Sequence, residues 1–189
     1  MPIDDTDKAL ADRIAAGDAD AFDVLMARHK RPVLNFIYRL TGDASEAEDL
    51  ALEVFVKAYR ALSGGGYQRG QAAVSTWLFQ IARNAAVDFL RHRARRPTVP
   101  LVELEDESGP AATGRTAAQE VSVQETGTQI AAAVAELPDD QRTALILSAY
   151  EDRSQREIAA IMQTTEKSVE GRLARARQFL RQRLAALRA

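Results

Sequence analysis

Residues 97–127 constrain the fold more than any other stretch, because they carry no sustained apolar period and cannot join a packed core. The stretch holds three prolines, three glycines, many serines and threonines, and six acidic residues against one arginine. A segment of this composition buries too little apolar surface to offset the entropy lost on ordering. We therefore predict a flexible acidic linker at residues 97–127, with separately folded units at residues 1–96 and 128–189.

Both flanking units carry apolar residues at three- and four-residue steps, the spacing that places side chains on one face of an α-helix. The helices expected in the first unit are residues 7–16, 19–41, 44–62 and 75–94. Ser75 stands where the N-cap of the last one is expected. In the second unit an alanine-rich helix ends before Pro138, and another starts near Asp139 or Asp140. Strand-type alternation of useful length does not occur, so the predicted fold class is all-α, with two small helical domains.

Composition excludes several classes of protein. The sequence has no cysteine, which removes disulfides and thiolate metal sites, and His29 and His92 lie too far apart to suggest a local zinc pair. The longest uninterrupted apolar run is a handful of residues, far below the roughly 18 that would span a bilayer. The acidic N-terminus MPIDDTDKA does not resemble an export signal. We expect a cytoplasmic protein without a metal, a cofactor or a membrane-inserted segment.

The net charge of −2 conceals three segregated blocks of charge. Residues 43–53 hold five acids and no basic residue, whereas residues 83–96 hold five arginines and one histidine against a single acid. From residue 171 to the C-terminus there are six arginines and no acid. Such blocks act on partners through their local potential, so the pattern indicates two basic surfaces and one acidic surface. Ordinary solvated helix faces would show the same pattern.

Residues 155–177, QREIAAIMQTTEKSVEGRLARAR, contain two short apolar-patterned helices joined by a polar turn. Ser154 and Thr165 are suited to cap these helices. The apolar stripe of the second helix consists of Val169, Leu173, Ala176, Leu180 and Leu184. Arginines occupy its other side, so the segment fits a helix-turn-helix, whose second helix enters the major groove. Gln163 replaces the glycine that is common in the turn.

Three ordered stretches resemble one family. LPDDQRTALILSAYEDRSQREIAAIMQTTEKSVEGRLARARQFLRQRL is similar to the promoter-binding region 4 of extracytoplasmic-function (ECF) sigma factors, the small initiation factors of bacterial RNA polymerase. DASEAEDLALEVFVKAYRAL and STWLFQIARNAAVDFLRHRAR resemble, in the same order and spacing, two diagnostic stretches of that family's region 2. The resemblance implies a sigma-70 family factor that binds core polymerase and directs promoter-specific transcription initiation. It places region 2 at residues 1–96 and region 4 at residues 128–189.

The resemblance also implies residues for each contact. Polymerase-binding positions on the acidic helix would be Glu48, Asp49, Leu52 and Glu53. Opening of the minus-10 element would fall to Tyr67, Arg69, Trp77, Arg83, Asn84, Asp88, Arg91 and Arg93. The glycine-rich loop around Tyr67 and Arg69 would receive a flipped base, although a plain flexible connector fits its composition nearly as well. Trp77 suits the core or a prop at the duplex edge better than a stacking platform.

The second helix of the helix-turn-helix would read the minus-35 element. Its implied DNA-binding residues are Lys167, Ser168, Glu170, Gly171, Arg172, Ala174, Arg175 and Arg177. Glu170 and Gly171 stand where many relatives have a cation and a serine. Because a glutamate accepts a hydrogen bond from cytosine N4 and cannot donate to guanine, the upstream motif is expected to differ from the family's usual one.

The expected partners are the clamp and flap of core RNA polymerase and promoter DNA, with the factor itself a monomer. Many relatives are held silent by an anti-sigma factor wedged between the two domains, and such a partner remains open here. A conventional helix-turn-helix repressor or activator, usually a dimer that binds operator duplex without polymerase, is the main alternative. An enzyme lacks support, because the sequence shows no Ser/His/Asp order, metal cluster or paired carboxylates. No catalytic residue is predicted.

Overall fold

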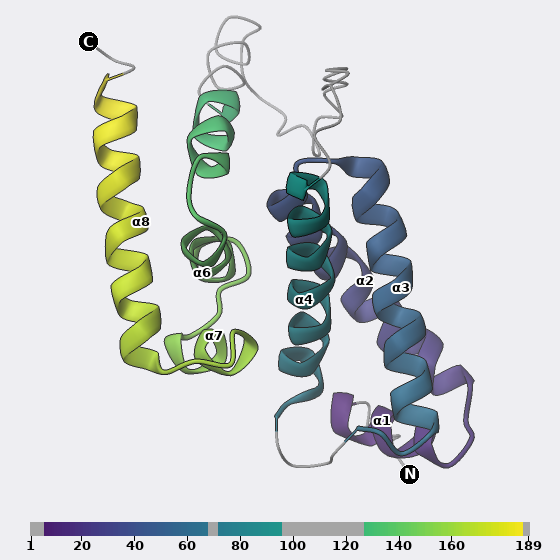
Figure 1. Ribbon diagram of the computed structural model, residues 1–189. Helices are drawn as coiled ribbons and strands as arrows, with labels where there is room; N and C mark the ends of the chain where they lie inside the picture. The colour runs from purple at the N-terminus through teal and green to yellow at the C-terminus, as the bar shows by residue number, and fades with distance from the viewer. Residues whose placement is uncertain (1–5, 68–71, 96–126, 187–189) are drawn as a thin grey trace, which may run out of the picture.

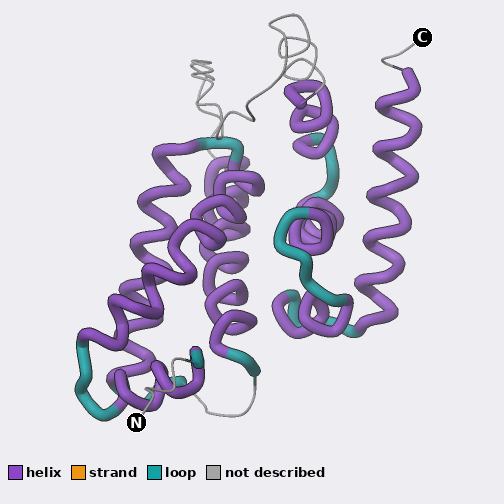
Figure 2. The backbone as a smooth tube through the Cα atoms, turned by 180° about the vertical axis from the view of Figure 1, so that it is seen from behind, coloured by secondary structure: helices purple, strands orange, loops and turns teal. Residues whose placement is uncertain are grey.

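The computed structural model describes residues 6–67, 72–95 and 127–186, and all regular structure in these ranges is helical (Figures 1 and 2). The all-α prediction is confirmed. None of the helices in these ranges is long and apolar enough to cross a membrane. The predicted linker, apart from Gly127, and the predicted loop residue Arg69 lie outside the described residues.

The first unit consists of α1 (Asp7–Ala15), α2 (Asp20–Thr41), α3 (Ala44–Ser63) and α4 (Val74–Arg95). The helix boundaries match the predicted ones to within one residue. The N-cap prediction for Ser75 is wrong, because α4 already begins at Val74 and Ser75 lies in its first turn. In this unit α2, α3 and α4 pack against one another, and α1 lies across all three.

The break between α2 and α3 is made by two adjacent residues. Gly42 ends α2 in the left-handed region, with φ of 72°, a conformation that a residue without Cβ adopts at little cost. Asp43 then caps α3, since its Oδ1 accepts a hydrogen bond from the Glu46 amide at 3.1 Å. The two helices can therefore reverse direction without an intervening loop.

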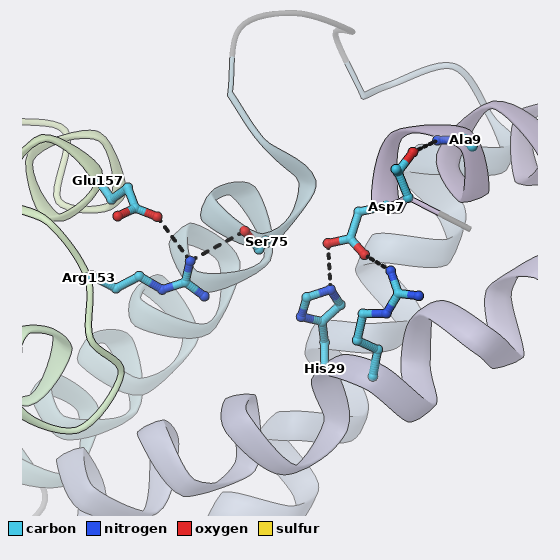
Figure 3. Close-up of polar contacts among 8 residues, drawn as sticks. Asp7, Ala9, His29, Ser75, Arg153 and Glu157 are labelled. Carbon is cyan, nitrogen blue, oxygen red and sulfur yellow. Dashed lines mark hydrogen bonds and ion pairs between the residues drawn. The ribbon is translucent and has the colours of Figure 1, made fainter. Parts of the chain in front are cut away.

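Burial of large side chains holds the first unit together. Phe36 of α2 and Phe79 of α4 are fully buried, with ring centroids 5.2 Å apart in an edge-to-face arrangement. Burying side chains of this size contributes about 1.5–3 kcal/mol each. At one end, Asp7 ties α1 to α2, because its Oδ1 accepts from Arg28 Nη1 at 2.6 Å and its Oδ2 lies 2.8 Å from His29 Nε2 (Figure 3).

The second unit contains a helical segment at residues 127–135, followed by α6 (Asp139–Ala149), α7 (Gln155–Ile161) and α8 (Glu166–Ala186). The residues of one apolar cluster that pack the first segment and α6 against α8 are Ile130, Val134, Leu137, Leu145, Ala176, Phe179 and Leu180. At the surface, the Arg183 guanidinium forms hydrogen bonds of 2.9–3.1 Å with the Glu136 carboxylate. The segment before α6 is thus held against the distal half of α8.

The two units lie directly against each other. α4 contacts α7, and α2 contacts α6; both figures show the short α7 beside the N-terminal half of α4. Gln80 Nε2 of α4 donates a hydrogen bond of 2.8 Å to the Ala160 carbonyl of α7. One cluster of buried residues runs without interruption from Leu10 in α1 to Leu173 in α8. The sequence predicted two bundles on a tether, and the structure adds this contact between them.

Candidate functional site

The helix-turn-helix is held by hydrogen bonds at the start of each helix. Ser154 Oγ accepts from the Glu157 amide at 3.3 Å, and Glu157 Oε2 accepts in return from the Ser154 amide at 2.9 Å, which completes a capping box. The hydrogen bond from the Ser154 side chain holds the pKa of the Glu157 carboxyl below its ordinary value. Thr165 Oγ1 accepts from the Ser168 amide at 3.2 Å. Both predicted caps are confirmed.

The turn between α7 and α8 places a non-glycine residue in the left-handed region. Gln163, the residue that replaces the usual glycine, has φ of 51°. That conformation lets the Thr164 amide donate to the Ala159 carbonyl at 2.9 Å and so satisfies an acceptor at the end of α7. A residue with a Cβ pays roughly 1–2 kcal/mol for it.

The predicted minus-35 residues separate into two groups on α8. Val169, Leu173 and Ala176 of the apolar stripe are buried, while Leu180 and Leu184 are partly buried. The predicted residues that face solvent fully are Lys167, Glu170, Ala174, Arg175 and Arg177, with Ser168 and Gly171 partly exposed. Arg172 turns the other way: its Nη2 donates to Asp140 Oδ2 at 3.1 Å, and the side chain is largely buried.

Gly171 leaves space beside α8 for the side chain of Arg175, one helical turn further along. A Cβ built at this position would lie 3.4 Å from Arg175 Nη1, and the three closest atoms all belong to that guanidinium. The missing side chain therefore gives the Arg175 guanidinium room to lie back along α8 toward its N-terminus. In the sequence Gly171 is only a departure from relatives, whereas the structure connects it to the placement of a cation.

The predicted minus-10 residues on α4 also separate. Asn84, Asp88 and Arg91 follow one another at steps of four and three and are exposed on one face. Arg93 instead donates to the Thr41 carbonyl at 3.3 Å and ties the end of α4 to the end of α2. Arg83 points toward the second unit, where its Nη2 lies 3.1 Å from Asp140 Oδ1. The structure therefore does not bring the predicted set to a single surface.

Tyr67 and Trp77 form a partly buried aromatic pair against the core. Their ring centroids are 4.8 Å apart, and the Tyr67 hydroxyl donates to the Ala72 carbonyl at 2.8 Å. Burial raises the pKa of Tyr67. A hollow of about 430 Å³ lies beside this tyrosine, between α1 and residues 72–74. Among the described residues no group of three or more metal-ligating side chains forms a metal site.

The outer face of α3 combines exposed acids with exposed large apolar side chains. Glu48, Asp49 and Glu53 are exposed, as predicted. Leu52 is 66% exposed, and Val56 and Tyr59 continue its stripe at steps of four and three. Val56 and Tyr59 were not predicted as part of this face, although their spacing from Leu52 places them on it. The Tyr59 ring is held by an edge-to-face contact with Phe22, with centroids 4.9 Å apart.

Comparison with known proteins decides the family. Residues 25–96 match the family model Sigma-70 region 2, and residues 128–180 match Sigma-70, region 4. The RNA polymerase sigma-H factor of Pseudomonas aeruginosa is 37% identical over 185 residues, covering 95% of this chain and 94% of that protein. The ECF RNA polymerase sigma-E factor of Escherichia coli K12 is 36% identical over 180 residues, covering 93% and 92%. The chain belongs to the ECF sigma factors.

Solved sigma factors share the fold of this ECF sigma factor. CnrH, in complex with the cytosolic domain of CnrY, matches with a TM-score of 0.70 and 26% identity over 95% of this chain and 97% of that one. The sigma factor RpoE of Bartonella quintana, in complex with the anti-sigma factor NepR, matches with a TM-score of 0.66 and 25% identity over 87% and 96%. As an ECF sigma factor, the protein directs transcription initiation.

Proposed function

We propose that this sigma factor docks on core RNA polymerase through the outer face of α3, opens the minus-10 element with region 2 and reads the minus-35 element with α8. Region 2 corresponds to residues 1–96, and region 4 to residues 128–189. The observation that carries the proposal is the exposed stripe of Leu52, Val56 and Tyr59 amid acidic residues.

The chemistry of the α3 face suits a protein partner. Apolar and aromatic side chains left in solvent on one helix face mark a docking surface, because burying them on association gains free energy. The acids around them provide a charged rim that favours a basic partner. Among the described residues, Glu53 pairs with Lys57 alone, at 3.4 Å, and a partner can displace this exposed ion pair at little cost. The proposed partner surface is the clamp of the polymerase.

The chemistry of the α8 face suits the major groove. Lys167, Arg175 and Arg177 are exposed cations, which bind phosphates or the O6 and N7 acceptors of guanine. Glu170 lies among them and accepts from the N4 amino group of cytosine. The exposed Ala174 allows close approach of the helix to the base edges. We therefore propose a minus-35 motif whose recognition includes a cytosine opposite Glu170.

In region 2, the exposed face of α4 would follow the opened strand at the minus-10 element. Arg91 is paired only loosely with Asp88, at 3.8 Å, and so is available to a phosphate. Asn84 is exposed one turn earlier and has both a donor and an acceptor for a base edge. The Tyr67 and Trp77 pair offers aromatic surface beside the hollow at α1, where an unstacked base could rest.

The decisive experiment is reconstituted transcription with core enzyme over a promoter library. We expect the purified chain to initiate at a subset of promoters together with core polymerase, while the chain alone binds the same duplexes feebly. The selected promoters would yield both recognition motifs at once. Tight duplex binding by the isolated chain, without polymerase-dependent initiation, would favour a conventional repressor over this assignment.

The proposal includes an anti-sigma factor as a further candidate partner, since the Bartonella quintana relative is in complex with one. The factor is proposed to act as a monomer, because one chain carries both DNA-reading units.

A further inference from the structure

A single carboxylate joins the two promoter-reading units. Asp140 lies in the first turn of α6, and its Oδ1 accepts from Arg83 Nη2 of α4 at 3.1 Å. Its other oxygen, Oδ2, accepts from Arg172 Nη2 of α8, also at 3.1 Å. The family resemblance implies a minus-10 contact for Arg83 and a minus-35 contact for Arg172. Asp140 thus neutralises one predicted DNA-binding cation of each unit at the same time.

A second junction joins the end of α2 to the end of α6. The Arg39 guanidinium lies 4.4 Å from the centroid of the Tyr150 ring, and Arg39 Nη1 lies 3.5 Å from Glu151 Oε1. The Glu151 side chain is nearly buried, and burial raises its pKa while Arg39 opposes that shift. An acid in this environment depends on its cation, so this contact also couples the units.

A third junction is made by Arg153, in the loop between α6 and α7. Its Nη1 donates to Ser75 Oγ of α4 at 3.4 Å and to Glu157 Oε1 at 3.2 Å (Figure 3). The same guanidinium stacks over the Phe79 ring of α4, 4.7 Å from its centroid. Ser75, expected as a helix cap, serves here as an acceptor for the other unit. The three junctions place cations of each unit against acceptors and rings of the other.

We infer that the three junctions hold the free factor in a closed, self-inhibited form, in which Asp140 occupies Arg83 as a DNA phosphate would. This inference rests on the proposed function, because it needs Arg83 to serve promoter DNA. Opening would release Arg83, whereas Arg172 shares the second unit with Asp140 and would keep its ion pair.

Geometry requires the closed form to open before a promoter can be read. The minus-10 and minus-35 elements lie about 25 base pairs apart, which is about 85 Å along B-form DNA at roughly 3.4 Å per pair. In the closed form Arg83 and Arg172 contact the same carboxylate. Thirty-one residues separate Arg95 from Gly127, enough chain to reach roughly 100 Å when extended. One closed molecule therefore cannot serve both elements, whereas an opened one can.

In the closed form, each arginine that donates to Asp140 or Ser75 also has a hydrogen-bond donor without an acceptor. Within the described residues, Arg83 Nε, Arg153 Nε and Arg172 Nη1 are buried without a partner. Buried donors without acceptors weaken the contact that buries them. A phosphate offers more acceptor oxygens than the shared carboxylate and would satisfy donors that Asp140 cannot reach. DNA therefore competes favourably for Arg83.

The first test measures the distance between the units directly. The natural sequence has no cysteine, so spin labels at Ala27→Cys on α2 and Gln178→Cys on α8, both exposed positions, report one distance distribution by pulsed electron paramagnetic resonance. We expect the closed population to dominate in the wild type. Asp140→Asn should lower the ratio of closed to open molecules by about fivefold, because it removes one ion pair between the units. Glu151→Gln, which touches no predicted DNA contact, should shift the population in the same direction.

Asp139→Asn is the matched control, because Asp139 lies in the same helical turn but pairs with Arg142 of its own helix, at 2.5 Å. It should leave the closed population unchanged, and thermal unfolding should confirm that each variant is folded. Equal distributions for the wild type and Asp140→Asn would overturn the inference. So would a closed distance that vanishes when labelled chains are diluted with unlabelled ones, because that result indicates contact between two copies.

The second test locks the junction between α4 and α7. A cleavable thiol crosslinker between Gln80→Cys and Ala160→Cys replaces the hydrogen bond found there. With core polymerase, the crosslinked factor should initiate at least tenfold less than the same double variant before crosslinking, and cleavage should restore activity. Undiminished initiation by the locked factor would overturn the inference. If the unlocked wild type failed to initiate at all, the proposed function would fail, while the distance measurement would still decide whether the chain closes.

Discussion

The outer faces of α3 and α8 use the same helical spacing to expose opposite chemistry. α3 presents Leu52, Val56 and Tyr59 to solvent with acids around them. α8 presents cations, and within the described residues none of its large apolar side chains is exposed. Protein interfaces gain most from a few buried apolar or aromatic anchors, whereas DNA interfaces are more polar and positively charged. The difference teaches that the two faces serve different classes of partner.

The largest effect should follow from placing a charge in the α3 stripe. Val56→Asp puts a carboxylate where a partner would bury an apolar side chain, so we expect polymerase affinity to fall about 30-fold, or about 2 kcal/mol. Competition for core enzyme measures this, and promoter binding by region 4 should not change. Val24 of α2 is equally exposed, at 41%, and points about 200° away from Phe22, the contact of Tyr59. Equal losses for Val24→Asp and Val56→Asp would remove the stripe from the interface.

A smaller effect is expected on α8, where many contacts share the binding energy. Arg175→Ala should weaken binding of the minus-35 element about tenfold, or about 1.4 kcal/mol, and lower the salt slope by about one. Measurements of affinity against salt concentration test both values, and polymerase affinity should stay unchanged. Arg181→Ala removes another exposed arginine of α8 that lies outside the predicted set. A greater loss of minus-35 affinity for Arg181→Ala than for Arg175→Ala would contradict the proposed DNA-binding face of α8.

Removing the cap of α7 should weaken region 4 without touching the α3 face. Ser154→Ala is expected to lower the free energy of unfolding by about 1 kcal/mol at neutral pH. Because the folded-state pKa of Glu157 is depressed, its contribution is present above the unfolded-state pKa and is lost as pH falls through the folded-state value. Ser154→Ala removes the main cause of that depression, so its loss of stability on acidification should be shallower than that of the wild type. Identical acid profiles would show that the capping box is not formed in solution.

The smallest effect should be a gain. Gln163→Gly relieves the left-handed backbone at the turn and is expected to stabilise the protein by about 0.5 kcal/mol, after the added entropy of the unfolded glycine is deducted. Thr164→Gly, at the next position and without positive φ, should destabilise it by a similar amount. Chemical denaturation distinguishes the two. Equal losses of stability for the two variants would mean that the turn is not strained. Polymerase binding through α3 should be unchanged in both.

Much of the fold was readable because its signals are local. Helix boundaries followed from apolar steps and caps, and Ser154 and Thr165 cap the helices predicted for them. Ser75 was mispredicted for an instructive reason: a serine near a helix start resembles a cap in sequence, yet its hydroxyl accepts from Arg153, which lies 78 residues away. Local patterns carry no information about such partners.

The sequence indicated the chemical character of each candidate surface, but not which of its residues pair within the chain. The cations of α8 and the acids of α3 named from the resemblance are exposed, Arg172 apart, and their contacts with a partner stay predictions. The partner of Arg83 and Arg172 was not foreseeable, because Asp140 is 57 residues from one and 32 from the other. In sequence, Asp140 is an ordinary acid at a helix start, and only the tertiary fold brings Arg83 of α4 and Arg172 of α8 to it.

The unbroken core, from Leu10 to Leu173, ties the thermal behaviour of one unit to that of the other. Units that share buried surface melt cooperatively, so the closed chain would show a single calorimetric transition. Separation would divide that transition into two, with the smaller bundle losing its neighbour's support. Polymerase or DNA that separates the units would therefore lower the thermal stability of region 4 when it frees region 4 to bind a promoter.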